Sequence, residues 1–334
     1  MNSSSAGSTN LPSWRAGRSA FSPGVAAPVR MALTETNFQA MGCECQVLTL
    51  GGSADLVDLG ERRVRELEQS WTRFSADSEL SRFNARAGHW VEVSPELSLL
   101  LWRGLAGFRL SSGLFNPFMG RQIRSVGYDR DFSELDVDST AEASGLARGS
   151  ARLTDDTGLH PLQFQRRRRL ARLAGGVEFD SGGIGKGLGA EVVVADVLRA
   201  GASGAMVSLG GDVAVGGLWP DEGWRIGIDD PVGRADQPMN IVLRDGSVCT
   251  SSILKRRWRN ESGSVAHHIL DPTTGQSVVG SDLVAASAIA RQGWRAEVLT
   301  KMAVVGGMTV ARELVRRNRG VALLVWDLSG TVST

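Results

Sequence analysis

A glycine-rich turn at residues 178–189 constrains the fold more than any other stretch of the chain. Five glycines lie within eight residues there, and one lysine, Lys186, lies among them. A short strand ending at Asp180 is expected to lead into the turn. A helix through Glu191–Arg199 is expected to follow and to end before Gly201. The chain therefore needs a strand–turn–helix unit in which the backbone is unusually accessible.

This turn can hold a phosphate, or it can be a turn and nothing more. Glycines let the backbone approach a ligand, and a helix N-terminus offers free N–H groups and positive dipole character to an anion. The stretch is not a P-loop, because no Gly-Lys-Ser/Thr follows the glycines, and it is not a clean GxGxxG fingerprint. Both interpretations stay open until the surrounding motifs are considered.

The size and charge of the chain are those of an ordinary globular protein. It has 334 residues, of which 42% are hydrophobic and 22% charged, and its net charge is +1. This length can bury one large core or two smaller lobes. A near-neutral charge points to neither nucleic acid nor a membrane surface as a partner. Four consecutive arginines, 166–169, could form a nucleic-acid patch, but we favour a solvated strand or loop face.

Three cysteines, Cys43, Cys45 and Cys249, are too few for a disulfide framework and odd in number. This usage fits a reducing compartment. Cys43 and Cys45 could bind a metal, but two positions on the same face of a strand explain their spacing more simply.

Residues 1–35 are expected to be a disordered tail, and residues 36–334 the folded domain. The tail is rich in Ser, Ala, Gly, Pro and Arg and contains no apolar core of a signal peptide. Nowhere does a run of 18 apolar residues occur, so no membrane span is predicted. We therefore expect a cytoplasmic protein.

Hydrophobic periodicity predicts helices and short strands, which do not alternate regularly along the chain. Ser53 is expected to cap a helix that ends near Trp71, and Ser94-Pro95 to start another. Two more helices are expected at 294–305, closed by Gly306-Gly307, and at about 309–318. Strands are expected at residues 38–50, 205–209, 224–228, 248–252, 283–290 and 321–326.

Two groups of residues stand out as candidates for chemistry. Phe74 lies in a polar loop, where an exposed aromatic ring needs something to pack or stack on. The chain has four histidines, and two of them, His267 and His268, lie together just before Asp271. An imidazole has an unperturbed pKa near 6.5 and can serve as a general base. The alternative is a structural histidine, because Asp-Pro-x-x-Gly is good turn chemistry by itself.

Taken together, these pieces resemble the ApbE-like flavin transferases, which are the FAD:protein FMN transferases. The resemblance covers about residues 36–334 and rests on motifs in the family's order, none of which is decisive alone. The motifs are Met41-Gly42-Cys43, the loop from Trp71 to Asn84, Phe115-Asn116-Pro117, Asp180 to Gly187, Ser208 to Asp212, Thr250-Ser251-Ser252, His268 to Gly275, and Ala296-Glu297.

The resemblance implies an α+β fold with mixed sheets flanked by helices and, as one arrangement, two lobes around an FAD cleft. The implied reaction moves FMN from the substrate FAD onto a Thr or Ser hydroxyl of an acceptor flavoprotein, releases AMP and uses Mg²⁺. Members of the family are often exported, whereas this N-terminus shows neither a signal peptide nor a lipid-anchor motif.

The resemblance also assigns the site residues. It implies that Phe74 stacks on the flavin, that His268 is the base and that Asp271 orients either His268 or the turn. The implied metal ligands are the Gly183 carbonyl and the Glu297 carboxylate, with position 301 as a third. The positions implied to contact FAD are Met41, Phe74, Phe115, Asn116, Pro117, Asp180, Lys186 and Ile269.

The implied metal site departs from the family pattern. Glu297 stands where the family has Asp, which keeps an oxygen donor one methylene further out. Lys301 stands where the family has Thr, and a cation there opposes Mg²⁺ binding unless its side chain turns away. Thr300 points about 100° around the helix and cannot simply replace it.

Two other functions are compatible with the same residues. An FAD pyrophosphatase would use the same site with water as the nucleophile. A flavin-binding protein that has lost catalysis would keep FAD intact, and Glu297 with Lys301 is the strongest argument for it.

Overall fold

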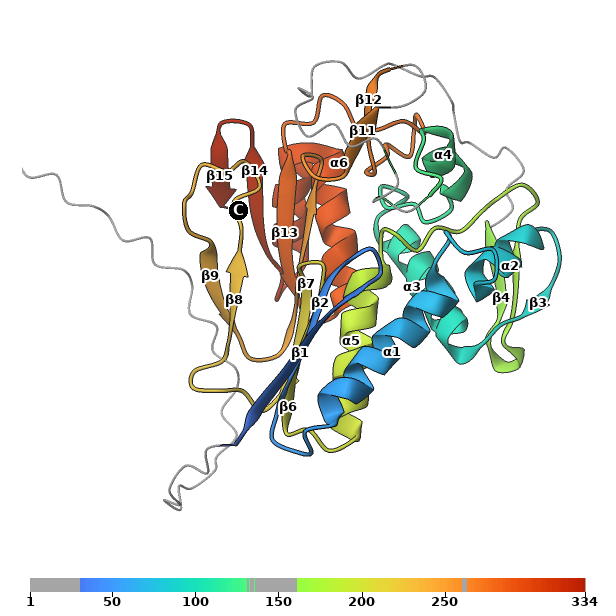
Figure 1. The fold of residues 1–334 in the computed structure, drawn as a ribbon. Coiled ribbons are helices and arrows are strands. Elements are labelled where there is room, and N and C mark those ends of the chain that lie inside the picture. The colour runs from blue at the N-terminus through green and yellow to red at the C-terminus, as the bar shows by residue number, and fades with distance from the viewer. Residues whose placement is uncertain (1–30, 131, 133–134, 136–160, 260–262, 334) are drawn as a thin grey trace, which may run out of the picture. The chain divides into compact units, whose positions relative to one another are not determined.

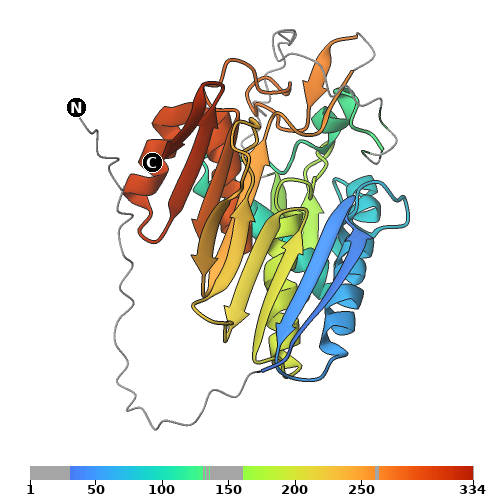
Figure 2. The same ribbon diagram turned by 60° about the vertical axis from the view of Figure 1, so that its left-hand side comes forward.

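An antiparallel sheet of eight strands forms the centre of the fold (Figures 1 and 2). The computed structural model describes residues 31–130, 132, 135, 161–259 and 263–333. The strand order is β1-β2-β6-β7-β10-β13-β14-β15, and each neighbouring pair is antiparallel. The strands are β1 (Leu33–Ala40), β2 (Cys43–Leu50), β6 (Gly204–Leu209), β7 (Asp212–Gly217), β10 (Gly246–Ser252), β13 (Ala285–Ala290), β14 (Ala322–Asp327) and β15 (Gly330–Ser333).

Three helices pack against this sheet, and Figure 2 shows them behind it. α1 contacts β1 and β2, α5 contacts β6 and β7, and α6 contacts β10 and β13. α5 also packs against both α1 and α6, so the three form one layer. Their bounds are α1 (Leu56–Trp71), α5 (Gly185–Arg199) and α6 (Gly293–Arg317).

Smaller elements surround this two-layer core. Three further helices are α2 (Glu79–Ala85), α3 (Pro95–Leu110) and α4 (Gly120–Ser125), and η3 (Arg166–Arg168) is a 3₁₀ turn. A three-stranded sheet has the order β3-β5-β4, and two hairpins are separate, β8 with β9 and β11 with β12. Their strands are β3 (Val91–Glu92), β4 (Leu162–Gln165), β5 (Leu170–Leu173), β8 (Trp224–Ile228), β9 (Met239–Leu243), β11 (Arg257–Arg259) and β12 (Val265–His267).

A capping serine was predicted at the start of two helices, and the structure confirms one of the two. The Ser94 hydroxyl accepts a hydrogen bond from the Leu97 N–H at 3.1 Å, and Pro95 is the first residue of α3, as predicted. The cap predicted at Ser53 is wrong. α1 begins at Leu56 after Asp55, and no side chain caps it.

Two turns differ from the predicted elements. The strand predicted at 38–50 is a hairpin, because Met41 and Gly42 have φ of 53° and 63° and reverse the chain between β1 and β2. The predicted break at Gly306-Gly307 is present inside α6, where Gly307 has φ 71° and ψ −169°. A side chain there would also clash with Asp282.

The predicted α+β class is confirmed, with several sheets and helices that flank the main one. The two-lobe arrangement is not confirmed, since residues 32–334 form one compact unit. Most of residues 129–160, which the sequence assigned to no element, lie outside the described residues. In the described ranges, none of the helices is long and apolar enough to cross a membrane.

Candidate active site

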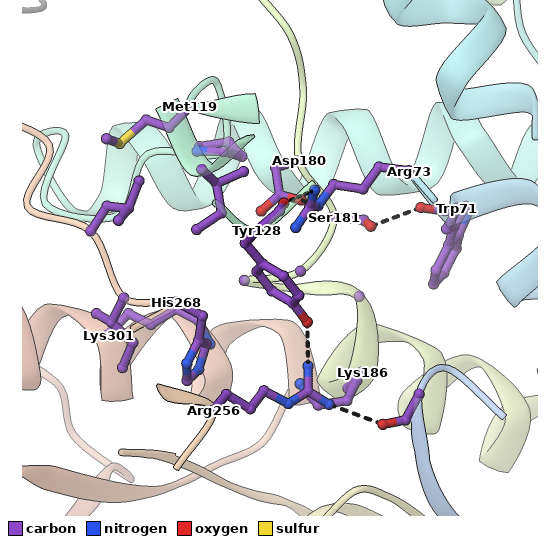
Figure 3. A pocket seen from close by; sticks show the side chains of 18 of the residues that line it. Trp71, Arg73, Met119, Tyr128, Asp180, Ser181, Lys186, Arg256, His268 and Lys301 are labelled. Carbon is purple, nitrogen blue, oxygen red and sulfur yellow. Dashed lines mark hydrogen bonds and ion pairs between the residues drawn. The ribbon is translucent and has the colours of Figure 1, made fainter. Parts of the chain in front are cut away.

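Segments from distant parts of the chain line one cavity, shown in Figure 3. Its walls come from the β1–β2 turn, the end of α1, the loop after α3, the glycine-rich turn and the middle of α6. All the predicted site residues except Asp271 and Glu297 line it. They are Met41, Phe74, Phe115, Asn116, Pro117, Asp180, Gly183, Lys186, His268, Ile269 and Lys301.

Hydrogen bonds to other segments hold the glycine-rich turn in place. Asn84 binds both backbone groups of Phe179, each at 2.9 Å, just before the turn. The Asp180 N–H donates to the Pro117 carbonyl at 2.7 Å. The Ser181 hydroxyl donates to the Trp71 carbonyl at 2.7 Å. The turn is thus tied to α1, to α2 and to the 115–117 loop before α5 begins.

The N-terminus of α5 already faces a buried carboxylate. The Gly187 N–H donates to Oε2 of Glu297 at 2.8 Å. A negative charge at this end of a helix is favourable, because the free N–H groups there carry partial positive charge. Glu297 itself is 1% exposed, so it does not reach the cavity wall.

Four charged side chains form a cluster beside this helix start. Lys186 Nζ lies 3.2 Å from Oδ2 of Asp212 and 3.6 Å from Oε1 of Glu297. Lys301 Nζ lies 3.3 Å from the same Oε1. Asp212 also accepts the Thr250 N–H at 3.1 Å. The two lysines and the two carboxylates therefore balance each other in charge.

Burial and pairing oppose each other in setting the pKa values of this cluster. Burial raises the pKa of Asp212, although Lys186 opposes the shift. Burial also acts on Glu297, but Lys301 and Lys186 outweigh it, so its pKa lies below the ordinary value. For Lys186, Asp212 and Glu297 outweigh burial and raise the pKa. The lysines thus keep Glu297 ionised inside the protein.

The residues predicted to hold a metal do come together, but they do not fit one. The Lys301 ammonium occupies one side of Glu297, and Gly187 and Lys186 occupy the rest of the carboxylate. No group of three or more His, Cys, Asp or Glu in the described part of the chain could hold a metal ion. A cation supplied by the chain itself stands where the resemblance placed Mg²⁺.

An aromatic wall with a stacked arginine forms another side of the cavity. The rings of Phe74 and Tyr128 lie 5.5 Å apart, and the Arg73 guanidinium lies 4.3 Å and 4.6 Å from their centres. The Nε of Arg73 lies 3.0 Å from the Asp180 carboxylate, which fixes its position. Phe74 is 39% exposed, so part of its face stays free for a flat ligand.

Sequence reasoning missed Arg73, Tyr128 and Arg256. Arg256 donates to the Tyr128 hydroxyl and to the Gly42 carbonyl, each at 3.2 Å (Figure 3). One available signal was that Tyr128 is the single tyrosine of the chain. Nothing local distinguishes Arg73 or Arg256 from the many exposed arginines.

The neighbouring histidines have different surroundings. His267 is buried, its Nε2 lies 3.0 Å from the Val278 carbonyl, and its Nδ1 accepts the Ile269 N–H. His268 lines the cavity, and its Nδ1 has no hydrogen-bond partner among the described residues. Burial, together with the positive charges of Arg256 and Lys301, lowers the pKa of His268 well below 6.5. His268 is therefore neutral at pH 7.

Asp271 lies in its own turn. Its Oδ1 accepts the Thr273 N–H at 2.7 Å, and its carbonyl accepts the Gly275 N–H at 2.8 Å. These are the hydrogen bonds that the turn interpretation of Asp-Pro-x-x-Gly requires.

A second cavity adjoins the first at His268. Both are lined by Gly182, Lys186, Arg256, His268 and Lys301. The second continues past the β6–β7 turn at Gly210-Gly211 and past the hydroxyls of β10, Thr250 to Ser252. His268, whose buried Nδ1 has no partner among the described residues, thus lies at the border of two spaces.

Comparison with known proteins gives consistent results. The ApbE family matches residues 41–325. The "FAD:protein FMN transferase" of Treponema pallidum is 31% identical over 298 residues, which are 84% of this chain and 80% of that protein. The protein of the same name from Rhodobacter capsulatus is 29% identical over 250 residues, which are 73% of this chain but only 45% of that protein.

Solved structures share the fold. The ApbE protein of Thermotoga maritima has a TM-score of 0.75 at 24% identity, over 91% of this chain and 97% of that one. The flavin transferase ApbE of Vibrio cholerae has a TM-score of 0.72 at 20% identity, over the same shares of the two chains. With the family match over nearly the whole described region, these similarities lead to one conclusion: the chain belongs to the ApbE family.

Proposed function

We propose that the protein transfers FMN from FAD to a Thr or Ser hydroxyl of an acceptor protein and releases AMP. The observation that carries the proposal is His268, which lines both of the adjoining cavities and whose buried Nδ1 has no hydrogen-bond partner among the described residues. One cavity has an aromatic wall and a glycine-rich turn, which suit a flavin dinucleotide. The other leaves room for an acceptor segment. The names of the relatives support the same reaction.

In this proposal the flavin lies against Phe74 and the diphosphate against the glycine-rich turn. Lys186, within this turn, and Arg256 both line the first cavity and supply positive charge to the diphosphate. Met41, Ile269 and the Phe115-Asn116-Pro117 loop complete the walls around FAD. The Asn116 side chain accepts the Phe118 N–H at 2.9 Å and thereby keeps this loop rigid. Asp180 holds Arg73 in the aromatic wall.

The proposed step is a phosphoryl transfer. The acceptor hydroxyl oxygen attacks the phosphorus of the FMN half of FAD and forms a phosphodiester. The bond from that phosphorus to the bridging oxygen breaks, and AMP leaves with that oxygen. His268 accepts the hydroxyl proton at Nδ1, while Lys186 and Arg256 stabilise the developing negative charge. Asp271 shapes the turn that carries His268.

Mg²⁺, which the family resemblance implies, has no role in this mechanism. The Glu297 carboxylate is already paired with the ammonium groups of Lys301 and Lys186 and accepts the Gly187 N–H. The chain's own cations therefore provide the positive charge in the step described above.

A covalent flavin label tests the proposal. The protein is incubated with FAD and an extract of its own cells, and the proteins are separated on a denaturing gel. A fluorescent band that survives denaturation is expected, and mass spectrometry of it should show one FMN on a Thr or Ser. Free FMN without any labelled protein would instead favour the pyrophosphatase, and FAD that stays intact would favour a binding protein without catalysis.

Replacing the proposed base sharpens this test. The variant His268→Asn should bind FAD within about twofold of the wild type, because the imidazole contributes little to a ligand held elsewhere. Its transfer rate should fall by roughly 10²–10⁴, the usual contribution of a general base. Flavin fluorescence measures binding, and the labelled band measures transfer. Unchanged labelling would rule out His268 as the base.

A further inference from the structure

Lys301 lies one helical turn after Glu297 on α6, and two polar contacts fix its side chain. Its Nζ lies 3.3 Å from Oε1 of Glu297 and donates to the Ser251 hydroxyl, also at 3.3 Å. That hydroxyl is in turn 2.7 Å from the Thr300 hydroxyl. The side chain of Lys301 is 13% exposed and lines both cavities, so its ammonium faces the space proposed for the diphosphate.

Both oxygens of Glu297 already have partners within the chain, and two of these partners are cations. Its Oε2 accepts the Gly187 N–H at 2.8 Å, and its Oε1 lies between Lys301 and Lys186. Mg²⁺ binds oxygen at about 2.0–2.1 Å and demands near-octahedral geometry. An ion at Oε1 would lie within a few ångströms of two ammonium groups, where the repulsion in a poorly hydrated site is large.

The charge of the cluster leads to the same conclusion. Asp212 and Glu297 contribute two negative charges, and Lys186 and Lys301 contribute two positive ones, so the group is neutral. Without Lys301 it would carry one net negative charge and would attract a metal cation. The residue at position 301 therefore decides whether the cluster needs an added cation.

The glycine-rich turn leaves room for this lysine. A Cβ atom at Gly183 would lie 3.3 Å from Cε and 3.5 Å from Cδ of Lys301, so the lysine stem passes directly over the glycine. The backbone that the resemblance assigned to a metal is thus in contact with the lysine.

We propose that the Lys301 ammonium takes the place of the divalent cation, so that FAD binding and FMN transfer need no added metal. This inference rests on the proposed FMN transfer. Lys301 keeps its contact with Glu297 and faces the oxygens of the FAD diphosphate. The hydroxyl proton still goes to His268, and AMP still leaves with the bridging oxygen.

The test compares FAD binding with and without metal, which does not require the acceptor. The whole protein is stripped of metal, and FAD is titrated by its fluorescence in EDTA and in millimolar MgCl₂. For the wild type the dissociation constant should differ by less than about twofold between the two buffers. For Lys301→Thr it should be at least about tenfold weaker in EDTA and should recover with Mg²⁺. Calorimetry should detect Mg²⁺ binding to the variant without FAD and none to the wild type.

Three further variants serve as controls. Lys301→Arg keeps the charge and should remain independent of metal. Lys301→Met removes the charge without adding an oxygen and should bind FAD weakly in both buffers. Arg312→Thr removes a positive charge from an exposed position of the same helix and should match the wild type. Thermal unfolding shows whether each variant is folded.

The results of these binding measurements distinguish a failure of this inference from a failure of the proposed function. If the wild type bound FAD at least about tenfold more tightly with Mg²⁺, the inference would be wrong and the transferase would stand. If Lys301→Thr bound FAD normally in EDTA, the inference would also be wrong. Failure to bind FAD in any buffer would overturn both.

Discussion

At the scale of single residues, two adjacent histidines show how surroundings determine a role. The His267 ring is held by Val278 and Ile269 and is 2% exposed, which makes it part of the core. The His268 ring faces a cavity with one nitrogen free. The residue type is the same for both, so the difference comes from position: His267 is the last residue of β12, and His268 follows the end of that strand.

The buried histidine predicts a loss of stability in acid. Burial lowers the pKa of His267 to about 4, whereas an unfolded chain has its ordinary value of 6.5. Between these values the unfolded state binds more protons, so the free energy of unfolding falls as the pH drops from 6.5 to 4. The loss should reach about 3 kcal/mol.

Urea unfolding of the wild type and of His267→Asn at pH 7.5 and pH 4 measures this contribution. Other titrating groups are common to both proteins, so the difference in stability between them should shrink by about 3 kcal/mol at the lower pH. A constant difference would mean that folding does not lower the pKa of His267.

At the scale of elements, the β6–β7 turn brings Cys43, Gly210 and Lys186 together. Gly210 has φ 61°, and a Cβ atom there would lie 2.9 Å from Sγ of Cys43 and 3.6 Å from Cδ of Lys186. Gly211 has φ 88° and no atom within 4 Å of its Cβ position. Both positions favour glycine because their φ is positive, but only Gly210 also has neighbouring atoms where a Cβ would lie.

This pair of glycines allows a matched test. Gly211→Ala should reduce the free energy of unfolding by about 1 kcal/mol, since only the left-handed backbone is strained. Gly210→Ala should cost roughly 2–3 kcal/mol, because strain and overpacking add. Urea unfolding compares the two variants, and equal losses would contradict the contacts described for Gly210.

The same elements show how far sequence reasoning reaches. Periodicity predicted α1, α3 and most strands, and the Ser94 cap predicted the start of α3, because those signals are local. The hairpin at Met41-Gly42 was missed, since a non-glycine residue with positive φ is uncommon and periodicity does not mark it. The predicted residues Phe115 and Lys186 do line the cavity, but their grouping came from the resemblance and not from spacing.

Residues that act through distant partners could not be predicted. Arg73 matters because its guanidinium packs against both the Phe74 ring and the Tyr128 ring, and Tyr128 is 55 residues further along the chain. Arg256 matters because it reaches Tyr128 and Gly42. Only the folded sheet and its helices bring these pairs together, so no local pattern marks them.

At the scale of the whole molecule, the site depends on the complete two-layer core. Its residues range from Met41, at the first hairpin, to Val305, in the middle of the long last helix. No local segment can form it, because every wall comes from a different element. Binding at this site should therefore be coupled to unfolding of the whole domain.

Ligand addition tests that coupling. FAD at about one hundred times its dissociation constant should raise the free energy of unfolding by about 2.7 kcal/mol, if it binds only the folded state. Thermal unfolding followed by circular dichroism should show a rise of several degrees. AMP alone, at the same concentration, serves as a control and should give a smaller shift because it lacks the flavin. No shift with FAD would mean that the folded protein does not bind FAD.

Lys301 also has a genetic consequence. Threonine and lysine codons can differ by a single base, and the family pattern has threonine at this position. One point mutation can therefore exchange a ligand for a cation while His268, the glycine-rich turn and the aromatic wall stay as they are. A lineage carrying the lysine would keep flavinylating its proteins when magnesium is scarce, and reversion would need only one base.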